Sequence, residues 1–397
     1  MKKHLVLGAL AVLALAACTK SEVVEINKSN EITLSAVSGK NLTKAADGYC
    51  NSVKPDDFQV WAATQGKTYF AEKKYIKSGD SYIADGAKFF WPDGKVDFFA
   101  AKNYEGAGTV TAILDPALGS TKLTVSGYEV ASAVDAQKDF IYAVTKDATK
   151  ATAPTALNFH HALSQIEFRA KNANENIYVY IGGVKVVNVK NKGTFTMTKA
   201  TTGHFENHND NHLSDPYYDT DSRGDTRGDW SEWDGQATYS VSFDTDIPLS
   251  GDGSIKNLTH QSDVDHNTKS MYLLPQTLDV WKGKTEHGDP LHSGKAYFVV
   301  SALIYNVANP GHFDSSTDVV LWGDNTSGTY KPKDIAVQLP DGMTWEDGFR
   351  YLYTFNFTNT GMGGSDPGSG DPVLTPITLT VTVDDFVDVA DKVVDVK

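Results

Sequence analysis

The most specific chemical signal lies at the start of the chain, around a single cysteine. A basic n-region (residues 2–4) precedes an uncharged apolar run (residues 5–16) that ends in Leu15-Ala16-Ala17-Cys18. The run has the length of a signal-peptide core and is too short to span a bilayer as a helix. Small residues directly before a cysteine are typical of a lipobox, where a peptidase cuts and the thiol carries diacylglycerol. We expect residues 1–17 to be a signal peptide and Cys18 to be acylated; an ordinary secretory signal with a chance cysteine is the alternative.

Histidines in a polar segment, residues 204–236, have a spacing that could bind a metal ion. His204, His208 and His212 lie four residues apart, so on a helix they would share one face and could bind zinc or copper. The Asn, Asp and Gly residues between them are poor helix formers. We interpret the segment as an exposed insertion and predict no metal site there.

Aspartates in the same segment resemble part of a calcium loop. Asp219, Asp221 and Asp225 alternate with other residues, but an EF-hand needs an oxygen ligand at its fifth position and Glu at its twelfth. Arg223 and Trp230 stand there. The aspartates therefore remain weak metal candidates only.

Two Arg-Gly-Asp triplets, residues 223–225 and 227–229, lie close together in this segment. Such tripeptides can dock in the metal sites of receptors, but they also arise readily in loops rich in Gly and Asp. A host or bacterial surface receptor therefore stays open as a partner.

Enzyme motifs are missing from the sequence. Gly66-Lys67-Thr68 and Gly283-Lys284-Thr285 lack the leading glycine of a phosphate loop, because Trp61 and Leu278 stand in its place. The sequence contains no G-x-S-x-G elbow and no H-E-x-x-H motif. We predict that the protein is not an enzyme and binds no cofactor.

The composition excludes one class of partner and one kind of stabilisation. The formal net charge of −14 and the absence of a clustered basic patch argue against nucleic-acid binding. The chain has two cysteines, and if Cys18 carries lipid then Cys50 has no intramolecular disulfide partner. The exported protein would need a sizeable apolar core instead.

The elements that must form this core are predicted to be strands. Apolar residues alternate with polar ones in many short segments, and Gly, Asp, Asn and Pro separate these segments, which is typical of half-buried antiparallel strands. No long stretch shows a helical period. The clearest alternating segments are residues 32–36, 58–62, 96–100, 166–170, 239–243, 297–303, 351–357 and 377–383. We predict an all-β chain of antiparallel sandwiches, with a boundary near residues 151–154.

Several stretches, in order, resemble the fimbrillin family, the FimA-type or Mfa-like subunits of the donor-strand (type V) pili of Bacteroidales. After the lipobox and a first strand come Phe89-Phe90-Trp91-Pro92-Asp93-Gly94, Asp139-Phe140-Ile141-Tyr142-Ala143, Phe159-His160-His161-Ala162-Leu163-Ser164-Gln165-Ile166, Tyr272-Leu273-Leu274-Pro275-Gln276 and Val381-Thr382-Val383-Asp384-Asp385-Phe386. The resemblance runs over nearly the whole chain.

This resemblance implies two transthyretin-like antiparallel β-sandwich domains in tandem. The expected ranges are residues 18–44 for a propeptide with tether and first strand, 45–154 for the N-terminal sandwich and 155–397 for the C-terminal one. The resemblance also implies an outer-membrane lipoprotein precursor that a trypsin-like protease cuts after a basic residue. The released subunit would join other fimbrillin subunits by strand exchange in a cell-surface fimbrium, supporting adhesion and biofilm.

The sequence can be interpreted in these terms on physical grounds. Ile32, Leu34 and Ala36 would share one face of the first strand, and the polar stretch behind it offers a cut between Lys44 and Ala45. The C-terminal tail, about residues 386–397, is the expected donor strand, because Val387 and Val389 continue the odd-numbered apolar face of residues 377–383 and three further valines follow. These donor residues are Val387, Val389, Val393, Val394 and Val396.

Other functions stay open at this point. The protein could be the tip or anchor subunit of a fimbrium, and an anchor would keep its lipid and stay uncut. It could also be a monomeric surface lipoprotein that binds glycans, with tryptophans as stacking platforms. Trp230 and Trp233 are the best candidates for that role, because they lie in the polar insertion.

Overall fold

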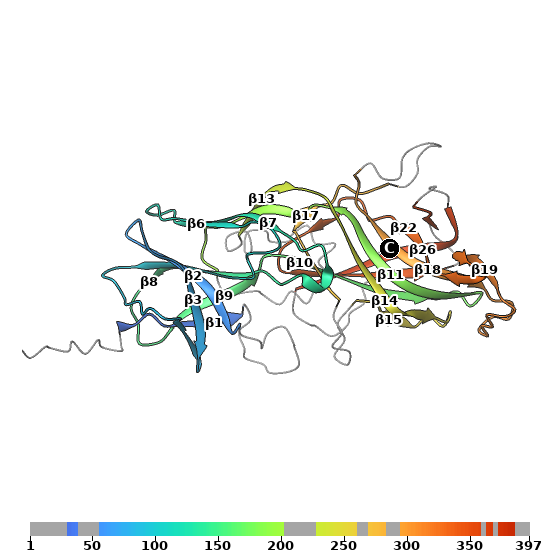
Figure 1. Ribbon diagram of the computed structural model, residues 1–397, viewed down its shortest axis with the longest axis horizontal. Coiled ribbons are helices and arrows are strands. Elements are labelled where there is room, and N and C mark those ends of the chain that lie inside the picture. Colours follow the sequence, from blue (N-terminus) through green and yellow to red (C-terminus); the bar gives the residue numbers. More distant parts are fainter. Residues whose placement is uncertain are drawn as a thin grey trace, which may run out of the picture.

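The computed structural model describes residues 30–38, 55–201, 228–259, 269–282, 294–358, 363–367 and 372–385. These residues form an elongated molecule built almost entirely of strands (Figure 1), which confirms the all-β prediction. The described residues also include a short 3-10 helix, η2 (Val134–Ala136). Within the described ranges, no helix is long and apolar enough to cross a membrane.

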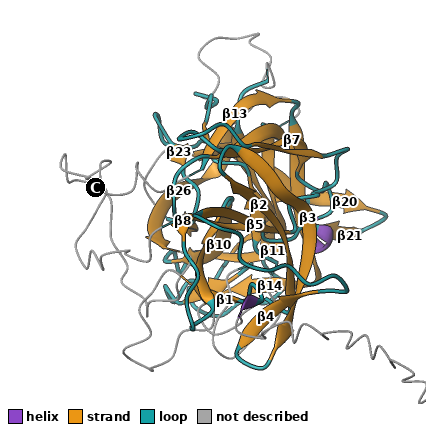
Figure 2. Ribbon diagram, turned by 90° about the vertical axis from the view of Figure 1, so that its left-hand side faces the viewer, coloured by secondary structure: helices purple, strands orange, loops and turns teal. Residues whose placement is uncertain are grey.

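Seven strands from the first part of the chain close into a barrel. Their order around it is β1-β4-β3-β2-β5-β8-β9. The bounds are β1 Leu34–Ser38, β2 Asp57–Thr64, β3 Lys67–Ser78, β4 Ser81–Ala84, β5 Val96–Lys102, β8 Ile141–Ala148 and β9 Thr155–His161. Figure 2 looks at this end of the molecule and shows β1 beside β4. Val96, Phe98 and Ala100 of β5 point into the barrel and are fully buried, as their alternation predicts.

A four-stranded sheet covers one side of the barrel. Its order is β13-β12-β7-β6, with β6 at Thr111–Asp115, β7 at Lys122–Glu129, β12 at Lys192–Met197 and β13 at Asp229–Asp234. Phe195 of β12 packs edge-on against Tyr142 of β8, with ring centroids 4.8 Å apart. The outward-facing Phe99 of β5 is buried because it belongs to the core between barrel and sheet.

The remaining described strands form an eleven-stranded sheet that folds over on itself. Its main path is β14-β11-β18-β22-β25-β26-β24-β10-β15, with β16 paired to β10 and β19 paired to β18. Phe298 of β18 packs on Phe168 of β10 at 5.0 Å and on Tyr353 of β24 at 4.6 Å between ring centroids. Strands far apart along the path thus face each other across a common core, as in a sandwich.

The bounds of these strands are β10 Ser164–Asn172, β11 Ile177–Val189, β14 Ala237–Leu249, β15 Ile255–Asn257, β16 Met271–Leu273, β18 Tyr297–Asn306, β19 Val319–Trp322, β22 Lys333–Val337, β24 Phe349–Phe357, β25 Gly363–Ser365 and β26 Pro372–Asp385. Two small ribbons complete the described structure, β17 (Gln276–Thr277) with β23 (Thr344–Trp345) and β20 (Asp324–Thr326) with β21 (Thr329–Lys331).

Two strand pairs depart from the predicted antiparallel pattern. β1 runs parallel to β9, and β10 runs parallel to β24. Both pairs join strands that are far apart in the sequence, and a parallel pair requires such a long connection. Local alternation carries no information about these partners.

No single position of the described chain divides the strands of one sheet from those of the next. β8 and β9 are paired through Ile141 and His161, so the predicted boundary at residues 154/155 falls between two strands of the barrel. β12 and β13, which follow that boundary, pair with β7 or with each other in the four-stranded sheet. The domain ranges and the tandem transthyretin-like arrangement therefore stay predictions.

The polar insertion predicted for residues 204–236 needs a correction at its end. Asp229–Asp234 is strand β13, which pairs with β12 through Trp230 and Phe195. The alternation of Trp with polar residues there is a strand pattern.

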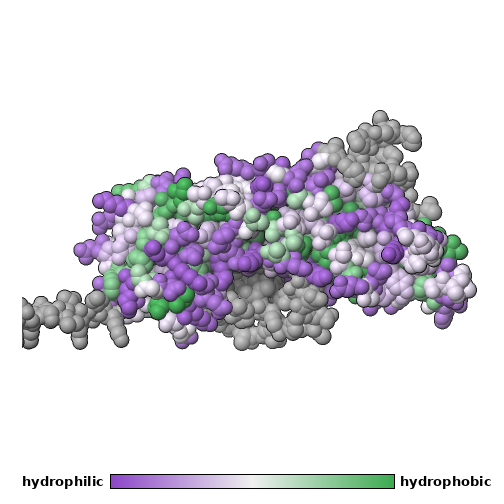
Figure 3. All heavy atoms as spheres, viewed as in Figure 1, coloured by the Kyte–Doolittle hydropathy of each residue, from purple (hydrophilic) through white to green (hydrophobic). Residues whose placement is uncertain are grey.

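The surface visible in Figure 3 is mostly hydrophilic, with hydrophobic residues in small separate patches, which fits the acidic composition.

Candidate functional site

The first strand fills a slot in the barrel with three alternating apolar side chains. Ile32, Leu34 and Ala36 are 1%, 0% and 2% exposed, and they belong to the barrel core. Thr33 and Ser35 between them are half-buried on the outer face. The alternation predicted from the sequence is confirmed. Full burial of the Ile and Leu side chains contributes roughly 3–6 kcal/mol gross.

One edge of the slot is β9. β1 pairs with it in parallel along its whole length, from Leu34 beside Thr155 to Ser38 beside Phe159. The amide of Thr155 also donates to the carbonyl oxygen of Thr33 over 2.9 Å. β9 therefore depends on β1 for one of its two rows of backbone partners.

The opposite edge combines β4 with a second segment, residues 88–91, which we call the strap. The amide of Ile32 donates to the Phe89 carbonyl at 2.8 Å, and the Trp91 amide donates to the Asn30 carbonyl at 2.9 Å. Lys88 Nζ lies 2.7 Å from Glu31 Oε2 in an ion pair. The strap holds the beginning of the strand from the side opposite β9.

The strap is itself anchored to the barrel. Tyr69 Oη donates to the carbonyl of Phe90 at 2.6 Å. Trp91 packs edge-on against Phe98 of β5, with ring centroids 5.8 Å apart. The ring centroids of Phe89 and Phe70 of β3 are 4.3 Å apart. These contacts keep the edge in position without using β1.

β4 holds the strand at a single position. Leu34 lies opposite Tyr82 in the antiparallel pairing of β1 with β4. The Tyr82 hydroxyl donates to the carbonyl of Pro55 at 2.6 Å, and its ring lies 4.7 Å from that of Phe58. Without β1, an apolar slot and two strand edges would be open, and such edges are ready to pair with another strand.

One buried polar atom lies beside this slot without a partner. The hydroxyl of Tyr75, on β3, is fully buried and makes no hydrogen bond in the described structure. Burial raises the pKa of Tyr75 far above its usual value. An unsatisfied buried hydroxyl costs roughly 1–3 kcal/mol of folding free energy. One hydroxyl beside the slot therefore lacks a hydrogen bond even with β1 in place.

The residues directly before the predicted donor tail form β26, a strand of the eleven-stranded sheet. β26 pairs with β24 from Ile377 beside Phe357 to Asp385 beside Phe349. Ile377 and Val381 are buried, 3% and 6% exposed. This confirms the expectation that residues 377–383 belong to the protein's own sheet, and the tail begins directly after β26.

The site residues predicted from sequence lie outside the described residues. This applies to the lipidation residue, the cut site, the donor residues and the weak metal candidates. They are Cys18, Lys44, Ala45, Val387, Val389, Val393, Val394, Val396, His204, His208, His212, Asp219, Asp221 and Asp225. Their roles stay predictions.

The tryptophan candidates for glycan stacking are described, and one of them needs a correction. Trp230 is only 8% exposed, and its Nε1 donates to the carbonyl of Ala162 at 2.6 Å. Its ring packs against Phe195 at 5.0 Å, so it belongs to the core. Trp233 is 45% exposed and its Nε1 donates to the Pro275 carbonyl, so it alone of the pair offers a surface.

Comparison with solved structures finds chains that are similar to this one at low sequence identity. A fimbrial protein from Bacteroides vulgatus is 15% identical with a TM-score of 0.51, over 90% of this chain and 99% of that one. A candidate cell adhesion protein from Bacteroides uniformis is 14% identical with a TM-score of 0.42, over 90% and 99%. The tip fimbrial protein Mfa3 from Porphyromonas gingivalis is 12% identical with a TM-score of 0.32, over 89% and 98%.

The first of these likenesses supports the fold alone, because the identity is low. No curated protein matches the sequence. A family model does match, the one described as fimbrillin-like, over residues 43–385. The match leaves out β1 at one end and the predicted donor tail at the other, and it spans most of the chain. The protein therefore belongs to the fimbrillin-like family.

Proposed function

We propose that the protein is a structural subunit of a cell-surface fimbrium, made as a lipoprotein and polymerised by strand exchange. In this proposal the precursor is acylated on Cys18 and reaches the outer membrane. A trypsin-like protease then cuts after Lys44, which removes the lipid and β1 together. The open slot takes up the tail, residues 386–397, of a neighbouring subunit.

The observation that carries the proposal is the position of β1. A strand of five residues at the beginning of the described chain completes the barrel, with Leu34 in its core. It is separated from β2 by 18 residues, 39–56, which contain Lys40 and Lys44. A cut in that segment would leave β1 held by non-covalent contacts only.

The tail has the pattern that such a slot accepts. β1 presents apolar side chains at every second residue, and Val387 with Val389, then Val394 with Val396, repeat this spacing. Three or four buried apolar side chains would contribute on the order of 5–10 kcal/mol gross per junction. The backbone pairing of a new strand with β9 adds to this.

The alternative functions differ in what they require of β1, the tail and the exposed tryptophans. An anchor subunit would keep β1 and its lipid, and a tip subunit need not donate a tail. A monomeric glycan-binding lipoprotein would need exposed stacking surfaces, and the burial of Trp230 removes one of its two best candidates. The valines of the tail, which are favourable in strands, support a shaft subunit.

The proposal is tested on protein recovered from its native cell surface. Mass spectrometry of the N-terminus and an unboiled gel should give a start at Ala45 together with a ladder of oligomers. The variant Lys44→Ala should keep the acylated start and run as a monomer, whereas Lys40→Ala should behave as the wild type. An acylated Cys18 start with monomer alone in the wild type would contradict the shaft assignment.

A further inference from the structure

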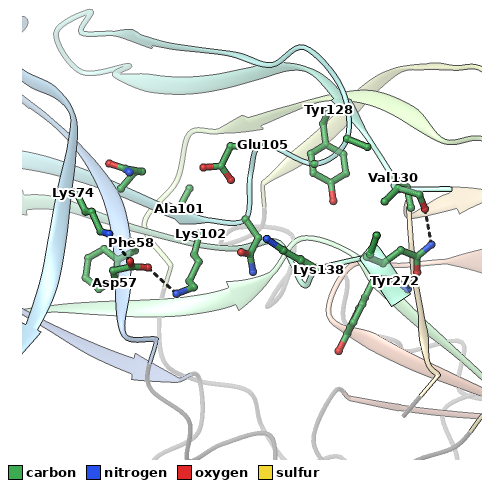
Figure 4. Close-up of a pocket in the computed structure, with 17 residues that line it drawn as sticks. Asp57, Phe58, Lys74, Ala101, Lys102, Glu105, Tyr128, Val130, Lys138 and Tyr272 are labelled. Carbon is green, nitrogen blue, oxygen red and sulfur yellow. Dashed lines mark hydrogen bonds and ion pairs between the residues drawn. The ribbon is translucent and has the colours of Figure 1, made fainter. Parts of the chain in front are cut away.

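A cavity of about 900 Å³ lies between the barrel, the end of β7, η2 and β16. Figure 4 shows its lining side chains. No residue of β1 lines the cavity, although Phe58 belongs both to its lining and to the core into which β1 packs. Its size falls in the range of small-molecule sites in proteins.

The floor of the cavity is apolar and its walls are polar. Phe58, Ala101 and Val130 line it and are buried. Tyr128 is 2% exposed, and its hydroxyl points into the cavity in Figure 4. Tyr272, half-buried, closes the side next to η2.

Two lysines and an aspartate form one wall. Lys74 and Lys102 each place Nζ 2.8 Å from a carboxylate oxygen of Asp57. The two ion pairs hold the pKa of Asp57 below its usual value, with the hydrogen bond from Lys102 as the larger cause. One carboxylate thus faces two ammonium groups, which leaves one positive charge in excess at this wall.

The opposite wall is held in place by an amide. Gln137 Oε1 accepts from the amide of Tyr272 at 2.8 Å, and its Nε2 donates to the carbonyl of Ala131 at 3.1 Å. Both ends of this amide are used in the wall itself. The next residue, Lys138, is exposed, lines the cavity and has no ion-pair or hydrogen-bond partner among the described residues. Its ammonium group points into the middle of the cavity in Figure 4.

The upper rim carries Glu105 on a loop that packs tightly against β7. A Cβ at Gly106, where φ is +55°, would lie 2.5 Å from the carbonyl oxygen of Glu129. The glycine is therefore required for the loop to lie this close, and the loop sets the position of Glu105. Counting Asp57, Lys74, Lys102, Glu105 and Lys138, the cavity has three positive and two negative charges, a net charge of +1, whereas the whole chain has −14.

This lining suits a ligand with many hydroxyl groups and one negative charge. A hydroxyl donates and accepts at the same atom, so it can pair with a carboxylate, an ammonium group and an amide placed close together. An apolar floor can cover the less polar face of a sugar ring. Lys138 offers an ammonium group without a partner among the described residues, and a charge-assisted hydrogen bond to a carboxylate is stronger than one between neutral groups.

We propose that this cavity binds an acidic glycan, a short oligosaccharide that carries one hexuronate residue, with its carboxylate on Lys138 and its hydroxyls on the walls of Asp57 and Glu105. The site uses residues of the barrel, of β7, of the segment around η2 and of β16. It does not require strand exchange, so it is independent of the role proposed for β1.

The test is calorimetric titration of the soluble protein with aldotriouronate, a trisaccharide that carries one glucuronate. The matched probe is the same trisaccharide with its carboxylate methyl-esterified, which keeps the rings and removes the charge. We expect binding of the acid and at least tenfold weaker binding of the ester. Lys138→Met should weaken binding of the acid at least tenfold.

Lys73→Met is the matched control, because Lys73 is an exposed lysine of β3 that does not line the cavity. It should bind the acid as the wild type does. Equal binding of acid and ester, unchanged binding by the Lys138 variant, or no binding of either probe would overturn the proposal. Circular dichroism of each variant separates loss of the site from loss of the fold.

Discussion

Leu34 lies beside Thr155 in parallel register and is fully buried in the barrel. This relationship joins the first described strand to the last strand of the barrel, across about 120 residues of sequence, and it closes the sheet. β4 adds one register pair and the strap adds two backbone hydrogen bonds and an ion pair. The strand is therefore integral to the precursor and is attached through few neighbours.

The first prediction concerns the apolar face of β1. Leu34→Ala should destabilise the unprocessed, non-acylated precursor by about 2–5 kcal/mol, because the side chain is fully buried and leaves a cavity. Ser35→Ala, on the outer face of the same strand, should change stability by less than about 0.5 kcal/mol. Urea unfolding monitored by tryptophan fluorescence measures both. Equal effects would contradict the placement of β1 in the barrel core.

The same pair of variants distinguishes precursor from polymer. If β1 leaves on processing, Leu34→Ala should not change the resistance of the finished polymer to denaturant. A polymer weakened by this variant would show that β1 stays in place.

The second prediction compares two buried tyrosines. The hydroxyl of Tyr75 has no partner in the described structure, whereas the hydroxyl of Tyr353 accepts from Trp345 Nε1 at 2.9 Å. Tyr75→Phe should therefore leave stability unchanged or raise it by about 1 kcal/mol, while Tyr353→Phe should lower it by roughly 1–3 kcal/mol, because it leaves the indole N–H unpaired. Urea midpoints of the two variants give the comparison. A stabilising Tyr353→Phe would contradict the hydrogen bond.

The third prediction concerns acid. Lys102 and Lys74 hold the pKa of Asp57 below its usual value in the folded state. A lowered folded-state pKa gives stability that is present above the unfolded pKa, about 3.9, and is lost as the pH falls through the folded pKa. Asp57→Asn should therefore be less stable than the wild type at pH 7, and the difference should shrink below pH 4. Urea unfolding at pH 7 and pH 3 tests this, and a difference that grows in acid would contradict it.

Sequence reasoning found the strands but not their partners. The alternation of Ile32, Leu34 and Ala36 predicted a buried face correctly, because a strand places every second side chain on one side. The parallel pairing of β1 with β9 and the support from the strap could not be predicted, because they join segments far apart in the chain. Phe89 and Trp91 belong to the motif that resembles the family, but their hydrogen bonds to Ile32 and Asn30, just ahead of β1, are a property of the folded barrel.

Two other features show why local sequence was not enough. Trp230 was interpreted as a surface platform because its neighbours are polar, yet strand β13 turns it into the core against Phe195. The cavity near η2 brings together Asp57, Lys138 and Tyr272, which no motif connects. Fold class follows from the repeated alternation, whereas both sites depend on tertiary contacts.

The most direct test of strand exchange is to lock β1 in its slot. Ser35 and Ala156 are register partners in β1 and β9, and adjacent strands lie about 4.8 Å apart, within the roughly 4.4–6.8 Å between Cα atoms that a disulfide allows. The double variant Ser35→Cys/Ala156→Cys, in a Cys50→Ser background, would keep β1 attached after the cut. Ser35→Cys in the same background is the control.

The measurement is an unboiled gel of surface protein from cells grown with and without a reductant. The account predicts processed monomer without reductant, and a ladder of oligomers once the disulfide is reduced. The single variant should form the ladder in both conditions. A double variant that polymerises fully with its disulfide intact would contradict the claim that β1 must leave for a neighbouring strand to enter.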